Sequence, residues 1–170
     1  MTFPSLEADC SQCAALCCVL LPFDKSAAFA FDKAGGEPCQ HLDACFGCRI
    51  HDQLSDRGFK GCVAFDCHGA GQRVVQDVFR GSTWREDPAL MSRMSRAFHL
   101  MRRVHELLLL LREADGLPLS QAQREEHTAL LKMLAPEAVW TEASLETFEL
   151  SAVETDVRRF LSGLRDIIGA

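Results

Sequence analysis

Cysteine is the residue type whose number and spacing could do chemistry in this chain. There are nine cysteines, all within the first 67 of 170 residues. Random placement would put several in the longer remainder, so the clustering indicates a local chemical task. Grouped thiolates are the usual ligands of zinc and of iron–sulfur clusters. The sequence therefore predicts a metal or iron–sulfur site among Cys10, Cys13, Cys17, Cys18, Cys39, Cys45, Cys48, Cys62 and Cys67.

The spacing of the first four cysteines favours more than one metal. Two residues separate Cys10 from Cys13, so both thiolates can reach one ion. Cys17 and Cys18 are adjacent, and the side chains of adjacent residues diverge. They suggest two metals, or a cluster with separate irons. Eight thiolates suit two tetrahedral zinc sites, or one four-iron cluster with a second site, and the spacing leaves both open.

Other uses of the cysteines are less favoured. A disulfide framework needs an oxidising compartment, but the residues before Cys10 are acidic where a secretory leader is basic. The apolar run 14–23 is too short to cross a bilayer. A redox dithiol at Cys10 and Cys13 would need a preceding strand, and none is predicted. Inert buried thiols would account for a few of the nine. We expect a cytoplasmic protein without a membrane partner.

Histidines near the cysteines are further candidate ligands. His51 lies three residues after Cys48, and His68 follows Cys67. Either could complete a site or orient a ligand through its second ring nitrogen, and a surface or packing role is as well supported. Three later histidines are expected at solvent-facing helical positions: His99, His105 and His127.

The elements that must position the cysteines are predicted to be irregular over residues 1–83. Glycine and proline turn signals recur there, for example at 34–38 and 69–71. Short extended runs are expected at 27–31 and 63–65. Such a segment has too little apolar periodicity to fold unaided, so metal ligation would supply the missing cross-links.

Residues 84–170 carry helical patterns instead. Apolar residues recur there at three- and four-residue steps. They predict helices over 88–115, 121–134, 142–148 and 151–168. Two capping boxes are predicted, Ser120 with Gln123 and Ser151 with Glu154. We therefore expect a mainly α protein: a cysteine-cluster metal-binding region over 1–83, and a small helical bundle over 84–170 that packs on it.

The composition excludes one class of partner. The net charge is −6 and no run is rich in lysine or arginine, so direct nucleic-acid binding is not expected. The apolar stripes of the helices could receive a protein partner, although such stripes more often pack internally. No triad order or carboxylate pair identifies a reaction, and enzyme activity stays open.

The cysteine pattern resembles that of the YkgJ-type cysteine-cluster family, described as zinc- or iron-chelating domains. The resemblance begins with Cys10-x2-Cys13-x3-Cys17-Cys18. It continues with Pro38-Cys39-x2-Leu42, Cys48-x-Ile50-His51, Arg57-Gly58-Phe59 and Gly61-Cys62-x2-Phe65-Asp66-Cys67. Gly58 stands where that family has a proline, and His51 where it has a tyrosine.

A closer likeness is to the amino-terminal region of actinobacterial pentapeptide-repeat proteins. It rests on 29–33, on 65–72 and on the step Trp84-Arg85, and covers roughly residues 8–112. No pentapeptide repeats are present in this chain, so the DNA-mimicking role of such repeats is not carried over. Cys45 matches no cysteine of the family. The resemblance implies eight metal ligands: Cys10, Cys13, Cys17, Cys18, Cys39, Cys48, Cys62 and Cys67.

Two functions are compatible with these features. In the first, the eight cysteines hold zinc or a non-catalytic cluster and build a structural or interaction module, with a protein as its partner. In the second, they hold an iron–sulfur cluster with a redox or enzyme-accessory role. The unequal spacing and the adjacent pair Cys17–Cys18 favour the second slightly.

Overall fold

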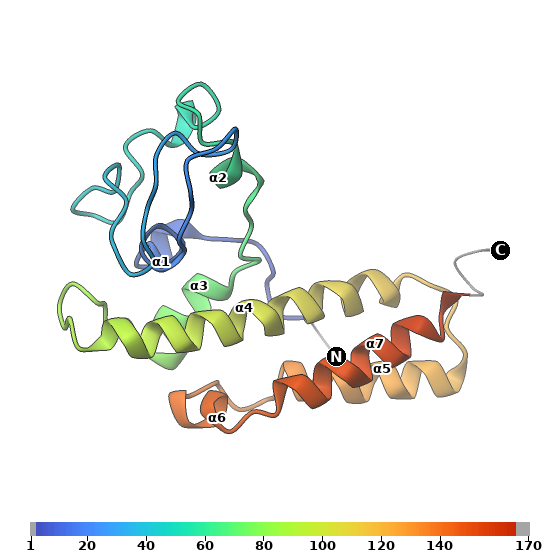
Figure 1. The fold of residues 1–170 in the computed structure, drawn as a ribbon. Coiled ribbons are helices and arrows are strands. Elements are labelled where there is room, and N and C mark those ends of the chain that lie inside the picture. Colours follow the sequence, from blue (N-terminus) through green and yellow to red (C-terminus); the bar gives the residue numbers. More distant parts are fainter. Residues whose placement is uncertain (1–2, 166–170) are drawn as a thin grey trace.

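The computed structural model describes residues 3–165 and is mainly α. Figure 1 shows an irregular lobe standing on a layer of long helices. We call residues 10–69 the cysteine lobe. The helices are α1 (Leu16–Leu20), α2 (Lys60–Ala64), α3 (Ala70–Arg73), α4 (Leu90–Asp115), α5 (Gln121–Leu134), α6 (Glu142–Glu146) and α7 (Leu150–Ser162). Short 3-10 turns at Cys10–Gln12 and His51–Gln53 and a π-helical turn at Val74–Val78 complete them.

The cysteine lobe is irregular, as predicted, but its two expected extended runs are wrong. Residue 63 lies in α2, and 27–31 forms bends. The bridges found in the lobe join Phe23 to Lys33 and Leu42 to Cys48. Aromatic stacking organises the first of these loops instead of a sheet. The rings of Phe23 and Phe29 are parallel, with centroids 4.4 Å apart.

The helical layer consists of α4, α5, α6 and α7, and α4 is its central helix. Helices α5 and α7 pack against it and against each other, and α6 packs near its start (Figure 1). Met94, Phe98, Met101, Leu108 and Leu111 of α4 are completely buried, as the apolar periodicity requires. The core is continuous from the lobe to α7. The expected helical bundle is therefore present.

The helix starts test the capping predictions. The Ser120–Gln123 box is confirmed, with reciprocal side-chain bonds at the start of α5. The box at Ser151 is wrong, because α7 begins at Leu150 and the carbonyl of Glu149 accepts its first bonds. Helix α4 starts at Leu90, two residues later than expected. The predicted extension of the last helix to 168 lies partly outside the described residues.

Two of the three later histidines are buried, contrary to expectation. His105 is completely buried and His127 is 4% exposed. One ring nitrogen of each imidazole lies within hydrogen-bond distance of a backbone carbonyl oxygen. The Nδ1 of His105 lies 2.5 Å from the oxygen of His68, and the Nε2 of His127 lies 2.9 Å from that of Leu111. Each imidazole therefore carries a hydrogen bond into the core, which periodicity alone does not reveal.

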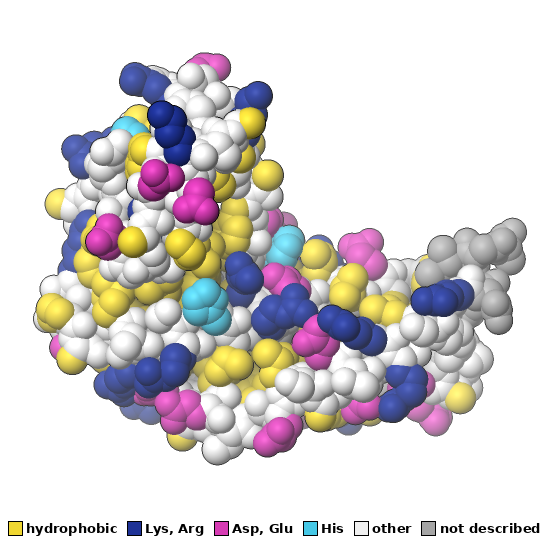
Figure 2. All heavy atoms as spheres, viewed as in Figure 1, with side chains coloured by type: hydrophobic (Ala, Val, Ile, Leu, Met, Phe, Trp, Pro, Cys, Tyr) yellow, Lys and Arg dark blue, Asp and Glu magenta, His cyan; other side chains and the backbone are white. Residues whose placement is uncertain are grey.

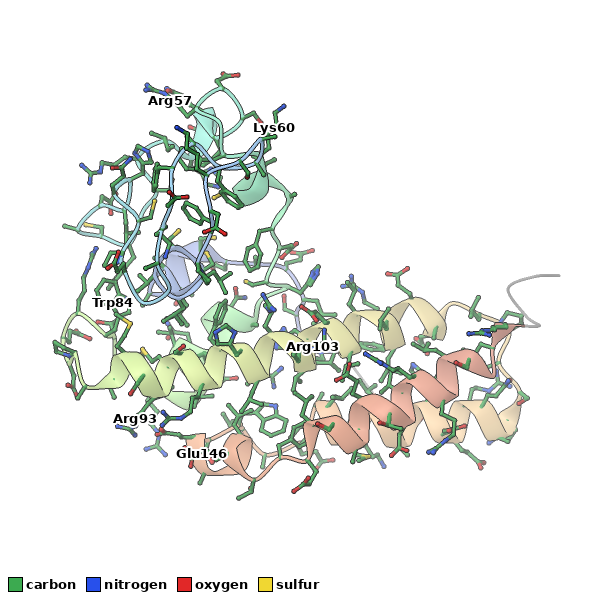
Figure 3. All side chains as sticks on the ribbon, in the orientation of Figure 1. Arg57, Lys60, Trp84, Arg93, Arg103 and Glu146 are labelled. Atoms are coloured by element: carbon green, nitrogen blue, oxygen red, sulfur yellow. The ribbon has the colours of Figure 1, made fainter. Side chains whose placement is uncertain are left out.

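The lobe and the helical layer are held together by α3, by the π-helical turn and by one tryptophan. Both helical segments pack on α4. The Nε1 of Trp84 donates to the carbonyl of Ala14 over 2.7 Å, and Arg85 donates to the carbonyls of Asp43 and Ala44. Figure 3 shows Trp84 at the base of the lobe. The division at residue 83 stays a prediction.

Charged pairs lie over the outside of the helical layer. Arg103 of α4 reaches Glu154 of α7 over 2.5 Å, and Arg93 of α4 pairs with Glu142 of α6. Figure 2 shows both signs of charge interspersed along this layer. Within residues 3–165, no helix combines the length and apolar content that crossing a bilayer requires.

Candidate metal centre

The structure brings four of the predicted ligands around one small cavity. Cys10, Cys13, Cys17 and Cys67 line a space of about 20 Å³. We call these residues the first thiol group. A space of this size holds about one water-sized sphere. Cys10 lies on the first 3-10 turn, Cys17 on α1, and Cys67 three residues before α3. The first thiol group therefore brings the start of the cysteine lobe next to its end.

Local backbone geometry directs these thiols inward. Asp9 caps the 3-10 turn by accepting from the backbone N–H of Ser11 over 2.9 Å. Ala15 then adopts a left-handed conformation, with φ of 53°, before α1. A non-glycine residue rarely adopts this conformation. The reversal lets Cys13 and Cys17 line the same cavity although α1 starts between them.

A glycine makes room for the most buried thiol. A Cβ on Gly71 would overlap the Sγ of Cys13 and contact Phe98. Gly71 lies inside α3, where glycine costs about 0.5–1 kcal/mol relative to alanine. The sequence reasoning treated 69–71 as a turn and missed this role. No helix is predicted over 69–71, so the glycines there indicate only a turn.

The remaining predicted ligands form the second thiol group: Cys18, Cys39, Cys48 and Cys62. Cys18 follows Cys17 in α1, and the N–H of Cys39 donates to its carbonyl over 3.0 Å. Burial, and after it the charges of Cys18, Cys39 and Cys48, raise the pKa of the Cys62 thiol to about 11. These four thiols are therefore electrostatic neighbours.

The two groups meet at the adjacent cysteines of α1. The Sγ atoms of Cys17 and Cys18 are 3.9 Å apart. Their hydrogen bond is the main cause that raises the pKa of Cys17 and lowers that of Cys18 to about 7. Cys17 lines the cavity of the first group. The charge of Cys18 acts on thiols of both groups, namely Cys10, Cys13, Cys48 and Cys62. The expected divergence of the adjacent side chains is therefore wrong, and their assignment to different groups stays a prediction.

Most of the thiols whose pKa is shifted bind protons more strongly in this arrangement, with Cys18 as the exception. Burial raises the pKa of Cys13 to about 12 and also raises those of Cys10 and Cys48. A metal must displace these protons, because only thiolates ligate. Within residues 3–165, no three histidine, cysteine, aspartate or glutamate side chains lie in an arrangement ready to hold a metal. The thiols would have to draw closer together around an ion.

Three further candidates lie outside both groups or at their margin. Cys45 is exposed, and its backbone N–H donates to Asp43. His51 is exposed, with its Nδ1 3.4 Å from Asp52, yet it is near enough to Cys18 to lower the pKa of that thiol. The Nδ1 of His68 lies 3.6 Å from Asp66. Their roles as spare thiol or ligands stay predictions.

Lys33 is a second residue that the sequence reasoning did not single out. It is 7% exposed, and its Nζ donates to the carbonyls of Val19, Ala34 and Glu37, each at 2.9 Å. Lysine is almost never buried without a charged partner. A lone lysine gives no signal in a sequence, so only the structure could identify this burial.

The chain is similar to the uncharacterized protein YybG of Bacillus subtilis (strain 168). The two are 36% identical over 165 residues, which is 97% of this chain and 59% of YybG. The chain thus spans about three fifths of the length of that relative. No family model and no solved structure matches the chain. The name of YybG indicates no activity.

Proposed function

We propose that the chain binds metal through eight cysteine thiolates, divided between the first and second thiol groups. The observation that carries the proposal is the cavity of about 20 Å³ surrounded by four thiols. All nine cysteines are free, so none is used in a disulfide. The resemblance of the spacing to the YkgJ-type family supports the same chemistry.

We infer a single ion rather than a four-iron cluster in each group, since four thiolates complete the coordination of one tetrahedral ion. Zinc is the ion most often held by four thiolates in a tetrahedron. The ligands would be Cys10, Cys13, Cys17 and Cys67 in one site, and Cys18, Cys39, Cys48 and Cys62 in the other.

The role that follows is a structural or interaction module. The cysteine lobe has little regular structure, and metal binding would supply its folding energy. Free thiols in such number suit the reducing cytoplasm. A protein is the expected partner, since the net charge of −6 disfavours nucleic acid. An iron–sulfur protein with a redox or accessory role is the alternative that the test must separate.

Metal analysis of anaerobically purified protein tests the proposal. We expect a colourless protein with about two zinc ions per chain, four thiolates to each. Cys17→Ser should lower the metal content and the melting temperature, whereas the exposed Cys45→Ser should change neither. A brown, iron-containing protein would establish the alternative. Metal-free protein, or unchanged metal content in Cys17→Ser, would overturn the proposal.

A further inference from the structure

The buried ammonium group of Lys33 lacks a carboxylate partner among the described residues. Its three hydrogen bonds go to carbonyl oxygens, which carry no full charge. No salt bridge in residues 3–165 involves it. An uncompensated buried charge costs several kcal/mol. A negative charge close to Lys33 would offset this cost.

The charged groups that act on Lys33 are mainly cysteine thiols. Burial lowers the pKa of Lys33, and the charges of Cys39 and Cys18, both of the second thiol group, oppose this shift, followed by those of Glu37 and Cys17. Its hydrogen bonds also hold the chain beside these thiols. Val19 directly follows Cys18, and Glu37 lies two residues before Cys39.

We propose that Lys33 is the counter-cation of the second thiol group, offsetting the charge that its four thiolates retain around a metal ion. This inference rests on the proposed function. Four thiolates around one divalent ion leave two negative charges in a partly buried place. A fixed ammonium nearby lowers the cost of that excess charge, and it also opposes protonation of the thiolates as the pH falls.

The two thiol groups differ in this respect. The lining of the first cavity in the described chain includes Asp9 and Gln72 but no lysine or arginine. The second group should therefore hold its ion more tightly and release it at lower pH than the first. Loss of Lys33 should weaken one of the two ions selectively, since groups around metal ligands typically contribute about 10–100-fold to affinity.

The test compares Lys33→Met with Lys33→Arg, and with the exposed Lys25→Met as a matched control. Zinc affinity is measured by competition with a chromophoric chelator, and zinc release is followed as the pH is lowered. In Lys33→Met, one ion should bind about tenfold or more weakly and leave at higher pH, with the other unchanged. Lys33→Arg should retain most of that affinity, and Lys25→Met should match the unmodified protein.

The outcomes separate this inference from the proposed function. If the unmodified protein binds no metal, both fail. If it binds two ions and Lys33→Met keeps both affinities, Lys33 is not the counter-cation although the metal sites stand. Equal losses in Lys33→Met and Lys33→Arg, or loss of both ions together, would assign a purely structural role and overturn the inference. Circular dichroism of the same variants identifies general unfolding.

Discussion

At the scale of single residues, the room around each sulfur decides what the thiols can hold. Gly71 leaves that room for Cys13, and the left-handed Ala15 turns the chain so that Cys17 reaches the same cavity. Spacing could predict that these cysteines gather. It could not predict how the adjacent thiols of Cys17 and Cys18 lie, because their Sγ atoms are 3.9 Å apart rather than divergent.

Gly71→Ala tests the need for this room. The new methyl group would displace the Cys13 Sγ, so the metal content should fall by about one ion per chain. Alanine in a helix otherwise stabilises by about 0.5–1 kcal/mol, so a lower melting temperature would report the overlap. Gly116→Ala is the control, since its Cβ would meet only the carbonyl of Glu113 at 3.6 Å. Full metal content in Gly71→Ala would contradict this account.

His105 should make the stability depend on pH. Burial lowers its pKa to about 4, below the 6.5 of an exposed histidine. The unfolded chain therefore takes up a proton that the folded chain excludes, and stability is lost as the pH falls through this window. Between pH 7 and pH 5 the loss is about 2 kcal/mol.

Urea unfolding at both pH values measures the effect, with His105→Gln as the comparison. The variant should be less stable at pH 7, because it disturbs a buried contact with His68, but its stability should depend less on pH. An equal pH dependence in the two proteins would remove His105 as the cause.

At the scale of elements, helix periodicity was a reliable guide and strand propensity was not. The stripes of α4, α5 and α7 face a core, as their spacing requires. The cysteine lobe is organised instead by aromatic contacts and by isolated bridges within its loops. Helix starts depend on which backbone donors are left free. Glu149 rather than Ser151 is therefore the N-cap residue of α7, which begins at Leu150.

The two serines form a matched pair for testing the caps. Ser120→Ala removes an observed capping box and should destabilise the protein by about 1 kcal/mol. Ser151→Ala changes a residue inside α7 and should alter stability by less than about 0.5 kcal/mol. Thermal unfolding of both variants gives the comparison. A larger loss in Ser151→Ala than in Ser120→Ala would mean that the observed start of α7 is incorrect.

At the scale of the whole molecule, one core joins a lobe with few helices to a layer with many. Residues from both parts, such as Leu16, Val74 and Phe98, are completely buried together. Disorder in the lobe would therefore expose one face of α4 (Figure 1). The stability of the helical layer should depend on the state of the thiols.

Removal of metal tests this dependence. A strong chelator should open residues 10–69 to proteolysis while most of the helical circular dichroism, which arises from α4, α5 and α7, remains. The melting temperature of the helical layer should fall as well, since α4 loses part of its cover. Chelation that leaves both the cleavage pattern and the melting temperature unchanged would show that metal does not support the lobe.

The meeting of the two groups at Cys17 and Cys18 has a consequence for the order of assembly. The cysteines from 18 to 62 lie entirely between Cys17 and Cys67 in the sequence, so the loop that the second group closes is nested within the loop that the first must close. Once the inner loop is pinned, Cys17 and Cys67 are joined through a short effective path, and the entropy of closing the outer loop falls. Loading of the second group before the first would therefore cost less entropy, and a ribosome would release Cys62, the last ligand of the second group, before Cys67, the last ligand of the first.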